Sequence, residues 1–293
     1  MGLIAFASSL DQIGPFAATV ADAAVGLEAV AGHDPNDSTS LPRPPPTCRA
    51  RLAEGVEGLR VGLIEDFVNE VSADCSSAAR TAADELAGAG AKVEDVSIPE
   101  LLHGLAAYYV IAPAEASSNL ARYDGVRYGL RVEAPDAATM NARTRGRGFG
   151  KEVRRRIMIG TYALSAGYYD AYYGKAQRVR TLVAEAFLRA YERFDVLVGP
   201  MVPSEAFRLG EKTANPLDMY VSDVCAVASN LAGHPAMSVP FALSGSGLPI
   251  GVQVLSPALG EDVMMRAAAV IEAAAPRDAR GPLSGPRGWR AGA

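Results

Sequence analysis

The residues of this sequence that could act as nucleophiles are serines beside glycines or in pairs. Nucleophilic acyl transfer needs a hydroxyl in a tight, glycine-bounded turn with a base nearby. The Ser-Gly-Ser-Gly run at 244–247 falls between two predicted strands, a position typical of a hairpin connection. Ser8-Ser9 and Ser117-Ser118 suit turns or helix caps. Gly-x-Ser-x-Gly, Gly-x-Gly-x-x-Gly and Walker motifs do not occur, so the sequence does not support a nucleotide site.

Five other polar residues have positions that could serve acid–base chemistry or ligand binding. Glu65 and Asp66 end a predicted strand, where ligand crevices form in open α/β sheets, although a solvated loop start is the commoner role of such a pair. Tyr109, Arg156 and Asp223 are the other three candidates. Asp223 is the least ordinary, because it interrupts an apolar helical stretch and a buried carboxylate needs a partner. For the other two, a core tyrosine and a surface arginine are the ordinary interpretations.

Composition excludes several classes of protein. The chain has 293 residues, 49% of them hydrophobic, and a net charge of −5. Its densest basic run is 154–156, too short for a chain that holds a nucleic-acid backbone by itself. Three separated cysteines and three scattered histidines predict neither disulfides nor a metal site. The apolar start, residues 1–10, is too short to cross a bilayer, so we expect a cytoplasmic protein.

The elements that must position these residues alternate between strands and helices. Strands at 59–65 and 92–98 enclose a helix with a face of small apolar residues, which predicts a βαβ unit with parallel strands. Further strands are expected at 195–198, 236–243 and 249–255. Helices are expected at 19–31, 101–121, 151–164, 168–194, 216–231 and 261–274, and loops at 33–51 and 131–150. The pattern predicts an α/β fold with a mixed, mainly parallel sheet flanked by helices.

The domain organisation follows from the same pattern. Residues 1–275 are expected to form one partial domain, and residues 276–293, rich in Gly, Pro and Arg, a disordered tail. The first stretch, residues 2–15, is apolar, rich in turns and without a helix cap. It has the character of a segment that continues an element upstream.

Several long strings resemble the amidase-signature family, and within it the A-subunit branch of the tRNA-dependent amidotransferases. They include Phe-Ala-Ser-Ser-Leu-Asp-Gln-Ile-Gly-Pro ending at Pro15, and Gly-His-Asp-Pro-Asn-Asp-Ser-Thr-Ser ending at Ser40. The strings around 111–129, 148–173, 219–240 and 248–254 continue the likeness in the same order. Together they cover residues 2 to about 275, which makes the resemblance far more specific than a short motif.

This resemblance implies a glutamine-hydrolysing protein that supplies ammonia to convert Glu-tRNA(Gln) to Gln-tRNA(Gln) or Asp-tRNA(Asn) to Asn-tRNA(Asn). The partners it implies are the amidotransferase's B and C subunits. The first of these uses ATP and Mg and recognises the misacylated tRNA, and the second, which is small, clasps the other two; no cofactor is implied for this chain. The family's glutamine-holding Tyr, Arg and Asp fall at Tyr109, Arg156 and Asp223, with Arg155 an open alternative for the Arg. Arginine suits a carboxylate, Asp an ammonium group, and Tyr adds a hydroxyl.

The sequence departs from the family's pattern at its catalytic residues. The family's Lys base and both serines precede the position that matches Gly2, so no catalytic residue is assigned here and the chain alone is expected to be inactive. Strands missing upstream would leave a sheet edge uncovered. Two alternatives remain open: a fragment of a general amidase, and a non-catalytic fragment that binds the ATP-using partner.

Overall fold

The computed structural model describes residues 3–212, 216–276, 278 and 279. The chain forms two compact units. Unit 1 comprises Met1–Gln12 and Ala106–Thr181, and unit 2 comprises Ile13–Leu105 and Leu182–Ala293. Whether the two make up one domain, as expected for residues 1–275, stays a prediction. Most of the expected tail, 277 and 280–293, lies outside the described residues.

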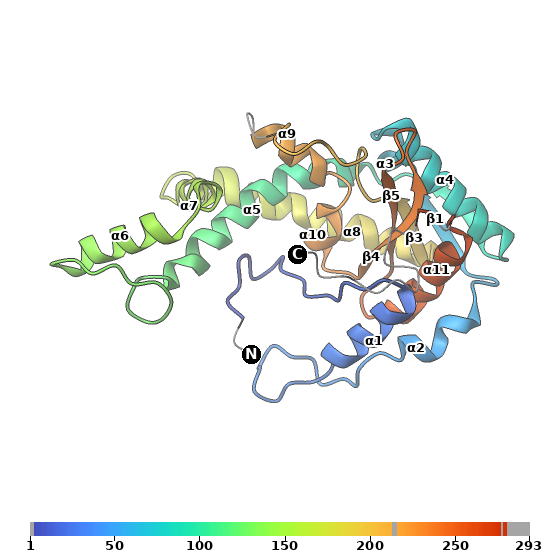
Figure 1. Ribbon diagram of the computed structural model, residues 1–293, viewed down its shortest axis with the longest axis horizontal. Coiled ribbons are helices and arrows are strands. Elements are labelled where there is room, and N and C mark those ends of the chain that lie inside the picture. The colour runs from blue at the N-terminus through green and yellow to red at the C-terminus, as the bar shows by residue number, and fades with distance from the viewer. Residues whose placement is uncertain (1–2, 213–215, 277, 280–293) are drawn as a thin grey trace, which may run out of the picture. The chain divides into compact units, whose positions relative to one another are not determined.

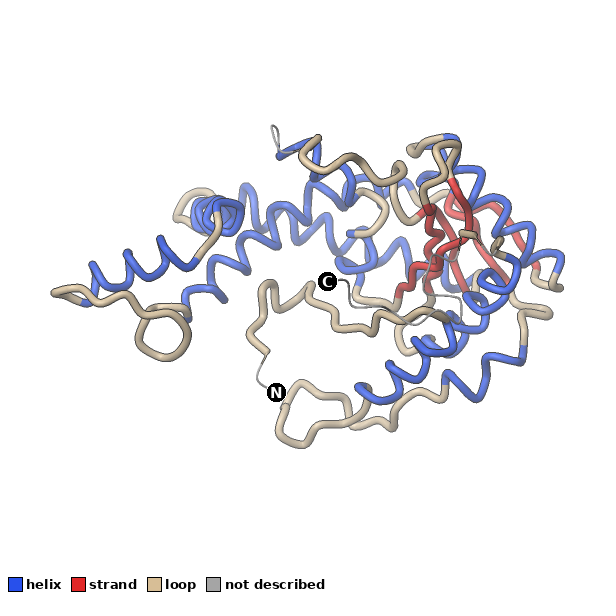
Figure 2. Tube along the Cα trace, in the orientation of Figure 1, coloured by secondary structure: helices blue, strands red, loops and turns tan. Residues whose placement is uncertain are grey.

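All five strands described belong to unit 2 and form one sheet in the order β2-β1-β3-β5-β4 (Figure 2). Their bounds are β1 Arg60–Ile64, β2 Lys92–Val96, β3 Val196–Pro200, β4 Ala236–Leu243 and β5 Pro249–Leu255. The strand β1 pairs in parallel with β2 and β3, and β5 pairs antiparallel with β3 and β4. Four strands therefore run one way and β5 runs against them, which confirms the mixed, mainly parallel sheet.

The predicted βαβ unit is present. The helix α4, Ala73–Gly88, connects β1 to its parallel neighbour β2 (Figure 1). Its buried face of alanines and Leu86 packs with buried residues of β3, β5 and α11, Glu261–Ala274, in the main core of unit 2. Gly62 faces the opposite side of the sheet, where an added Cβ would lie 2.7 Å from the Leu197 side chain. The small residues on α4 thus allow this helix to pack closely on one face of the sheet, and Gly62 leaves room for the Leu197 side chain on the other.

The remaining helices of unit 2 include two that were not predicted, α3 Glu65–Asn69 and η1 Leu52–Glu54, and two expectations need correction. The others are α1 Val20–Val30, α2 Cys48–Arg51, η2 Pro99–His103, residues 182–193 of α8 (Lys175–Arg193), α9 Pro216–Tyr220, η5 Val221–Asp223, α10 Val227–Ala232 and α11. Thr19 caps α1 by accepting a hydrogen bond from the Asp22 amide, as expected. The expected loop 33–51 contains the short helix α2. The expected helix 216–231 is broken after η5, because its β-branched and short polar residues are weak helix formers.

Unit 1 is helical throughout its ordered elements. It contains most of α5 (Gly104–Asn119), η3 (Leu120–Arg122), α6 (Ala137–Gly148), α7 (Lys151–Ala163), the π-helical turn η4 (Asp170–Gly174) and the start of α8 (Lys175–Arg193). The prediction of a loop at 131–150 was wrong, since α6 occupies most of it. Asp136 caps this helix by accepting from the Thr139 amide, and Met140 and Thr144 are buried one turn apart. A cap and a buried pair outweigh the glycines, which lie at its end.

The helices α5 and α7 approach each other closely within unit 1. A Cβ added to Gly160 would collide with the Pro113 carbonyl, so only glycine allows this approach. Beside that contact the Ser117 and Thr161 hydroxyls lie 2.7 Å apart. Of the helices in the described part of the chain, none is both long enough and apolar enough to cross a membrane.

Candidate functional site

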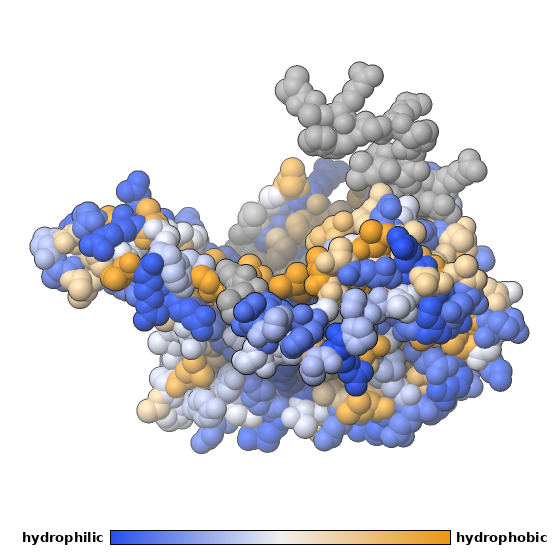
Figure 3. All heavy atoms as spheres, turned by 90° about the horizontal axis from the view of Figure 1, so that it is seen from below, coloured by the Kyte–Doolittle hydropathy of each residue, from blue (hydrophilic) through white to orange (hydrophobic). Residues whose placement is uncertain are grey.

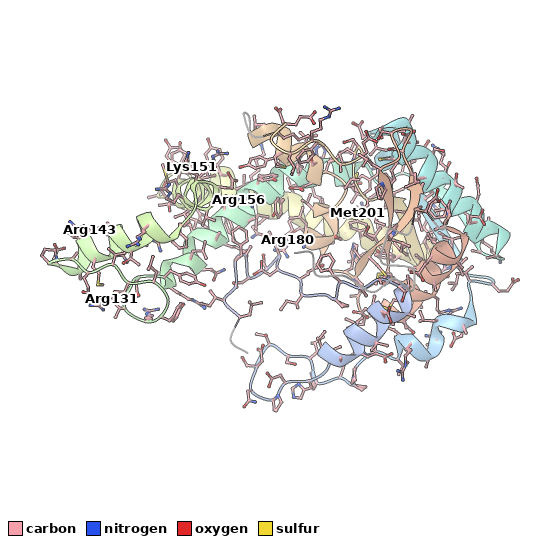
Figure 4. All side chains as sticks on the ribbon, in the orientation of Figure 1. Arg131, Arg143, Lys151, Arg156, Arg180 and Met201 are labelled. Carbon is pink, nitrogen blue, oxygen red and sulfur yellow. The ribbon has the colours of Figure 1, made fainter. Side chains whose placement is uncertain are left out.

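The structure brings Tyr109 and Arg156 together in unit 1. Tyr109 lies on α5 and Arg156 on α7, and the guanidinium carbon of Arg156 is 5.6 Å from the centre of the Tyr109 ring. The same carbon is 5.9 Å from the Phe6 ring. A cation over aromatic faces is attracted by their quadrupoles. Figure 4 shows Arg156 on its helix α7.

Arg156 is held by an acidic neighbour that sequence analysis did not single out. Its Nε donates to Glu152 Oε1 at 2.9 Å, one helical turn earlier, and the Arg156 side chain is only 20% exposed. Partial burial opposes the charged form, but the hydrogen bond to Glu152 and the charge of its carboxylate help to raise the pKa of Arg156 overall. Glu152 therefore orients the guanidinium. Its i, i+4 spacing from Arg156 was a signal for this pair.

Arg155, the alternative to Arg156, has a different environment. Its side chain is 42% exposed, and its Nη1 lies 3.2 Å from Glu152 Oε2. The neighbouring arginines thus share one carboxylate, but the aromatic contacts with Phe6 and Tyr109 are found at Arg156. A carboxylate ligand that needs a guanidinium packed against rings is better matched by Arg156.

Within unit 1, side chains of α5 and α8 form hydrogen bonds with the first residues of the chain. Ser9 donates through its amide and its hydroxyl to the Glu115 carboxylate, at 2.9 and 2.5 Å. Arg180 donates to the Ser9 hydroxyl and carbonyl at 2.6 and 2.7 Å. Asn119 donates to the Ser8 hydroxyl at 2.9 Å and to the Phe6 carbonyl at 3.2 Å. These bonds fix the segment that carries Phe6, so both serines have structural partners here.

Asp223, the third predicted residue, lies in unit 2. It is the last residue of η5 and is partly buried. The sequence had predicted instead that it lies inside a continuous helix. Its carbonyl accepts from the Ala226 amide at 3.0 Å, which begins the turn leading to α10. A carboxylate at the end of a short turn can accept from an ammonium group.

Beside Asp223 the structure pairs a serine with a lysine, the combination that amide hydrolysis by the expected route requires. Lys212 Nζ donates to Ser222 Oγ at 2.8 Å. The ammonium also lies 4.6 Å from the centre of the Phe207 ring, a cation–π contact. These two contacts join Lys212 to η5 and to the Phe207 ring, as expected for a structural anchor.

The other residues weighed from the sequence have structural roles. Asp66 accepts from the Ile98 amide and, at 3.3 Å, from the Ser97 hydroxyl, so it joins α3 to the end of β2. The run 244–247 connects β4 to its antiparallel neighbour β5, as predicted for a hairpin. Ser246 donates to Glu205 at 2.5 Å, and the Ser244 and Ser246 hydroxyls lower the pKa of that carboxyl.

Comparison with known proteins places this chain in a family. The model of the amidase family matches residues 1–265. The chain belongs to the amidase family. This amidase-family chain is 56% identical over 275 residues to the glutamyl-tRNA(Gln) amidotransferase A subunit of Rubrobacter xylanophilus, covering 93% of the chain and 57% of that relative. It is 50% identical to the A subunit of the same enzyme in Maricaulis maris, covering 98% of the chain and 58% of the relative.

A solved structure agrees with these relatives. The crystal structure of the glutamyl-tRNA(Gln) amidotransferase A subunit from Thermotoga maritima superimposes with a TM-score of 0.73 at 40% identity, covering 93% of this chain and 54% of that one. The fold and the A-subunit branch expected from sequence are thereby confirmed. The amidase-family chain spans somewhat more than half the length of the relatives it matches.

Proposed function

We propose that this chain forms the glutamine-binding part of the ammonia-supplying A subunit of a tRNA-dependent amidotransferase. The observation that carries the proposal is 56% identity over 93% of the chain to a relative with that name. The reaction served would be conversion of Glu-tRNA(Gln) to Gln-tRNA(Gln), of Asp-tRNA(Asn) to Asn-tRNA(Asn), or both. The B and C subunits would be the partners, and tRNA would be reached through the B subunit.

Three residues would hold glutamine. Arg156 would bind the α-carboxylate, because its guanidinium is already oriented by Glu152 and packed against Tyr109 and Phe6. The Tyr109 hydroxyl would add a hydrogen bond. Asp223 would accept from the α-ammonium group. An oriented guanidinium loses little freedom when it binds, which favours tight recognition of a small ligand.

The chain by itself would bind glutamine without hydrolysing it. Of its four lysines, Lys212 is the one hydrogen-bonded to a serine in the described residues, and it also contacts the Phe207 ring. This chain would need no cofactor, while ATP and Mg would be used by the B subunit. The cytoplasm is the compartment we propose, which suits three free, buried thiols.

Glutamine titration into the purified chain by calorimetry tests the proposal. Arg156→Lys removes a bidentate contact worth about 1.5–3 kcal/mol, so we expect affinity to fall roughly 10- to 100-fold. Arg155→Lys is the matched control, since it makes the same change one residue away, and we expect it to leave affinity within about twofold. Loss at Arg155 instead of Arg156 would assign the carboxylate to Arg155. A wild-type chain that does not bind glutamine would refute the proposal.

A further inference from the structure

The charge of this chain is divided unequally between its two units. Unit 1 carries 13 Lys and Arg residues against seven Asp and Glu residues, a net charge of +6. The whole chain is at −5, so unit 2 is at −11. The overall acidity that argued against a nucleic-acid contact is therefore a property of unit 2 alone. A marked charge asymmetry within a chain is a feature of proteins that contact polyanions.

We call four of these cations, two on α6 and two on α7, the cationic stripe: Arg143, Arg147, Lys151 and Arg154. All four are exposed. Within the described residues, no carboxylate lies at ion-pair distance from any of the four. Arg143 and Arg147 are four residues apart on α6, and Lys151 and Arg154 are three apart on α7, so each pair consists of neighbours on its own helix. Figure 4 shows Arg143 and Lys151 on the successive helices α6 and α7.

Helix stability does not account for the whole stripe. Arg147 lies in the last turn of α6, where the helix dipole favours a cation. Lys151 and Arg154 lie in the first turn of α7, where the dipole disfavours one. Glu152 is the one acidic residue in that turn, and it is engaged by Arg155 and Arg156. Two cations are thus kept at the end of α7 where they cost the helix stability.

The exposed face of α7 that carries Lys151 also carries an aromatic residue further along the helix. Lys151, Met158 and Tyr162 are spaced by seven and four residues, so they lie along one face of the helix. The Tyr162 ring centre is 4.5 Å from that of Tyr168 and 6.0 Å from that of Tyr172. We call Tyr162, Tyr168 and Tyr172 the tyrosine group; they are 51%, 41% and 44% exposed. Exposed rings beside cations can stack with unpaired bases.

We propose that the cationic stripe and the tyrosine group form an RNA-binding face of unit 1. The stripe would contact phosphates, and the tyrosine group would stack against bases of an unpaired segment. In Figure 3 the visible surface at the end that carries α6 is mostly hydrophilic, which suits a wet phosphate contact by the cationic stripe. The inference rests on the proposed function in one respect: the complex would act on tRNA recognised by the B subunit, so RNA is the polyanion that unit 1 would meet.

Binding of fluorescent RNA to the full chain, without glutamine, tests this inference separately from the glutamine site. The probes are a single-stranded oligouridylate and an unmodified tRNA transcript, titrated by anisotropy over a range of salt. The variant replaces all four residues of the cationic stripe with Ala. The matched control replaces Arg43, Arg49, Arg80 and Lys92 with Ala; these are also three arginines and one lysine, all exposed, in unit 2. Both variants therefore have the same net charge.

We expect the variant that lacks the cationic stripe to bind RNA about tenfold more weakly. The slope of log affinity against log salt concentration should become shallower by about 3, since each of the four phosphate contacts contributes about 0.7. The control should stay within about twofold. Tyr168→Ala should weaken binding to the oligouridylate roughly tenfold, because stacking is lost.

Three outcomes would overturn the inference. One is an RNA affinity too weak to measure in the unsubstituted chain, and another is equal loss in both quadruple variants, which would mean that only net charge matters. The third is binding of a polyglutamate probe as tight as RNA binding and unaffected by Tyr168→Ala, which would assign the face to an acidic protein.

Discussion

His234 makes the stability of unit 2 depend on pH in a way that can be calculated. It is buried against Phe187 and Tyr191, with ring centres 4.2 and 5.4 Å away. Its Nδ1 lies 3.3 Å from the Pro235 carbonyl, and its Nε2 is buried without a hydrogen-bond partner among the described residues. A proton added there would be a charge in apolar surroundings. Burial accordingly lowers the pKa of His234 from 6.5 to about 4.

The sign and size of the effect follow from these two pKa values. The unfolded chain takes up a proton near pH 6.5, whereas the folded chain resists protonation until about pH 4. Stability is therefore complete above pH 6.5 and falls as pH drops towards 4, by about 1.4 kcal/mol per pH unit. The loss from this one residue is about 2 kcal/mol at pH 5 and about 3 kcal/mol at pH 4.

Urea unfolding followed by circular dichroism between pH 7 and pH 5 measures this dependence. His234→Leu places an apolar side chain of similar size there and removes the titrating group. Between pH 7 and pH 5 we therefore expect its free energy of unfolding to fall by about 2 kcal/mol less than that of the unsubstituted chain. The control is His33→Leu, which makes the same replacement at an exposed histidine. Equal pH dependence in the unsubstituted chain and His234→Leu would refute the reasoning.

Two further substitutions test the packing. Gly160→Ala should destabilise unit 1 by about 1–3 kcal/mol, because the added Cβ would collide with the backbone of α5. Gly146→Ala is the control, and it should be neutral or stabilising because there is open space around Gly146. Thermal melts compare the two variants. Equal melting temperatures would show that the α5–α7 contact is looser than described. Gln253→Leu should cost about 2 kcal/mol or more, because the buried Gln253 amide donates to two backbone carbonyls, at 2.9 and 3.1 Å. Gln177→Leu, which loses one partly exposed bond, should cost less than half as much in denaturant titrations; a similar cost for both would contradict this argument.

The elements that could be predicted from sequence are those with a strong local pattern. The helix α11 and the strands β4 and β5 have the predicted bounds, because a period of 3.6 or short β-rich runs between turn residues define them without help from the rest of the fold. The order of strands in the sheet was not predictable in this way. It depends on contacts between residues far apart in the chain, such as the pairing of β1 with β3.

The elements and contacts that were not predicted also have physical explanations. The helix α6 was expected to be a loop because of its glycines, but Asp136 caps it and Met140 anchors it in unit 1. The break after η5 reflects weak helix formers in an apolar stretch. In the candidate site, the Glu152–Arg156 pair could have been found from its i, i+4 spacing. The contact of Arg156 with Tyr109 could not, because it joins α5 to α7.

Ammonia release from glutamine by the purified 293-residue chain shows whether the chain hydrolyses the ligand that it is proposed to bind. We predict no release above a no-enzyme blank under conditions where calorimetry detects glutamine binding. Steady release by the unsubstituted chain that is lost in both Ser222→Ala and Lys212→Ala would contradict it, because that result would make the Ser222–Lys212 pair a working nucleophile and base.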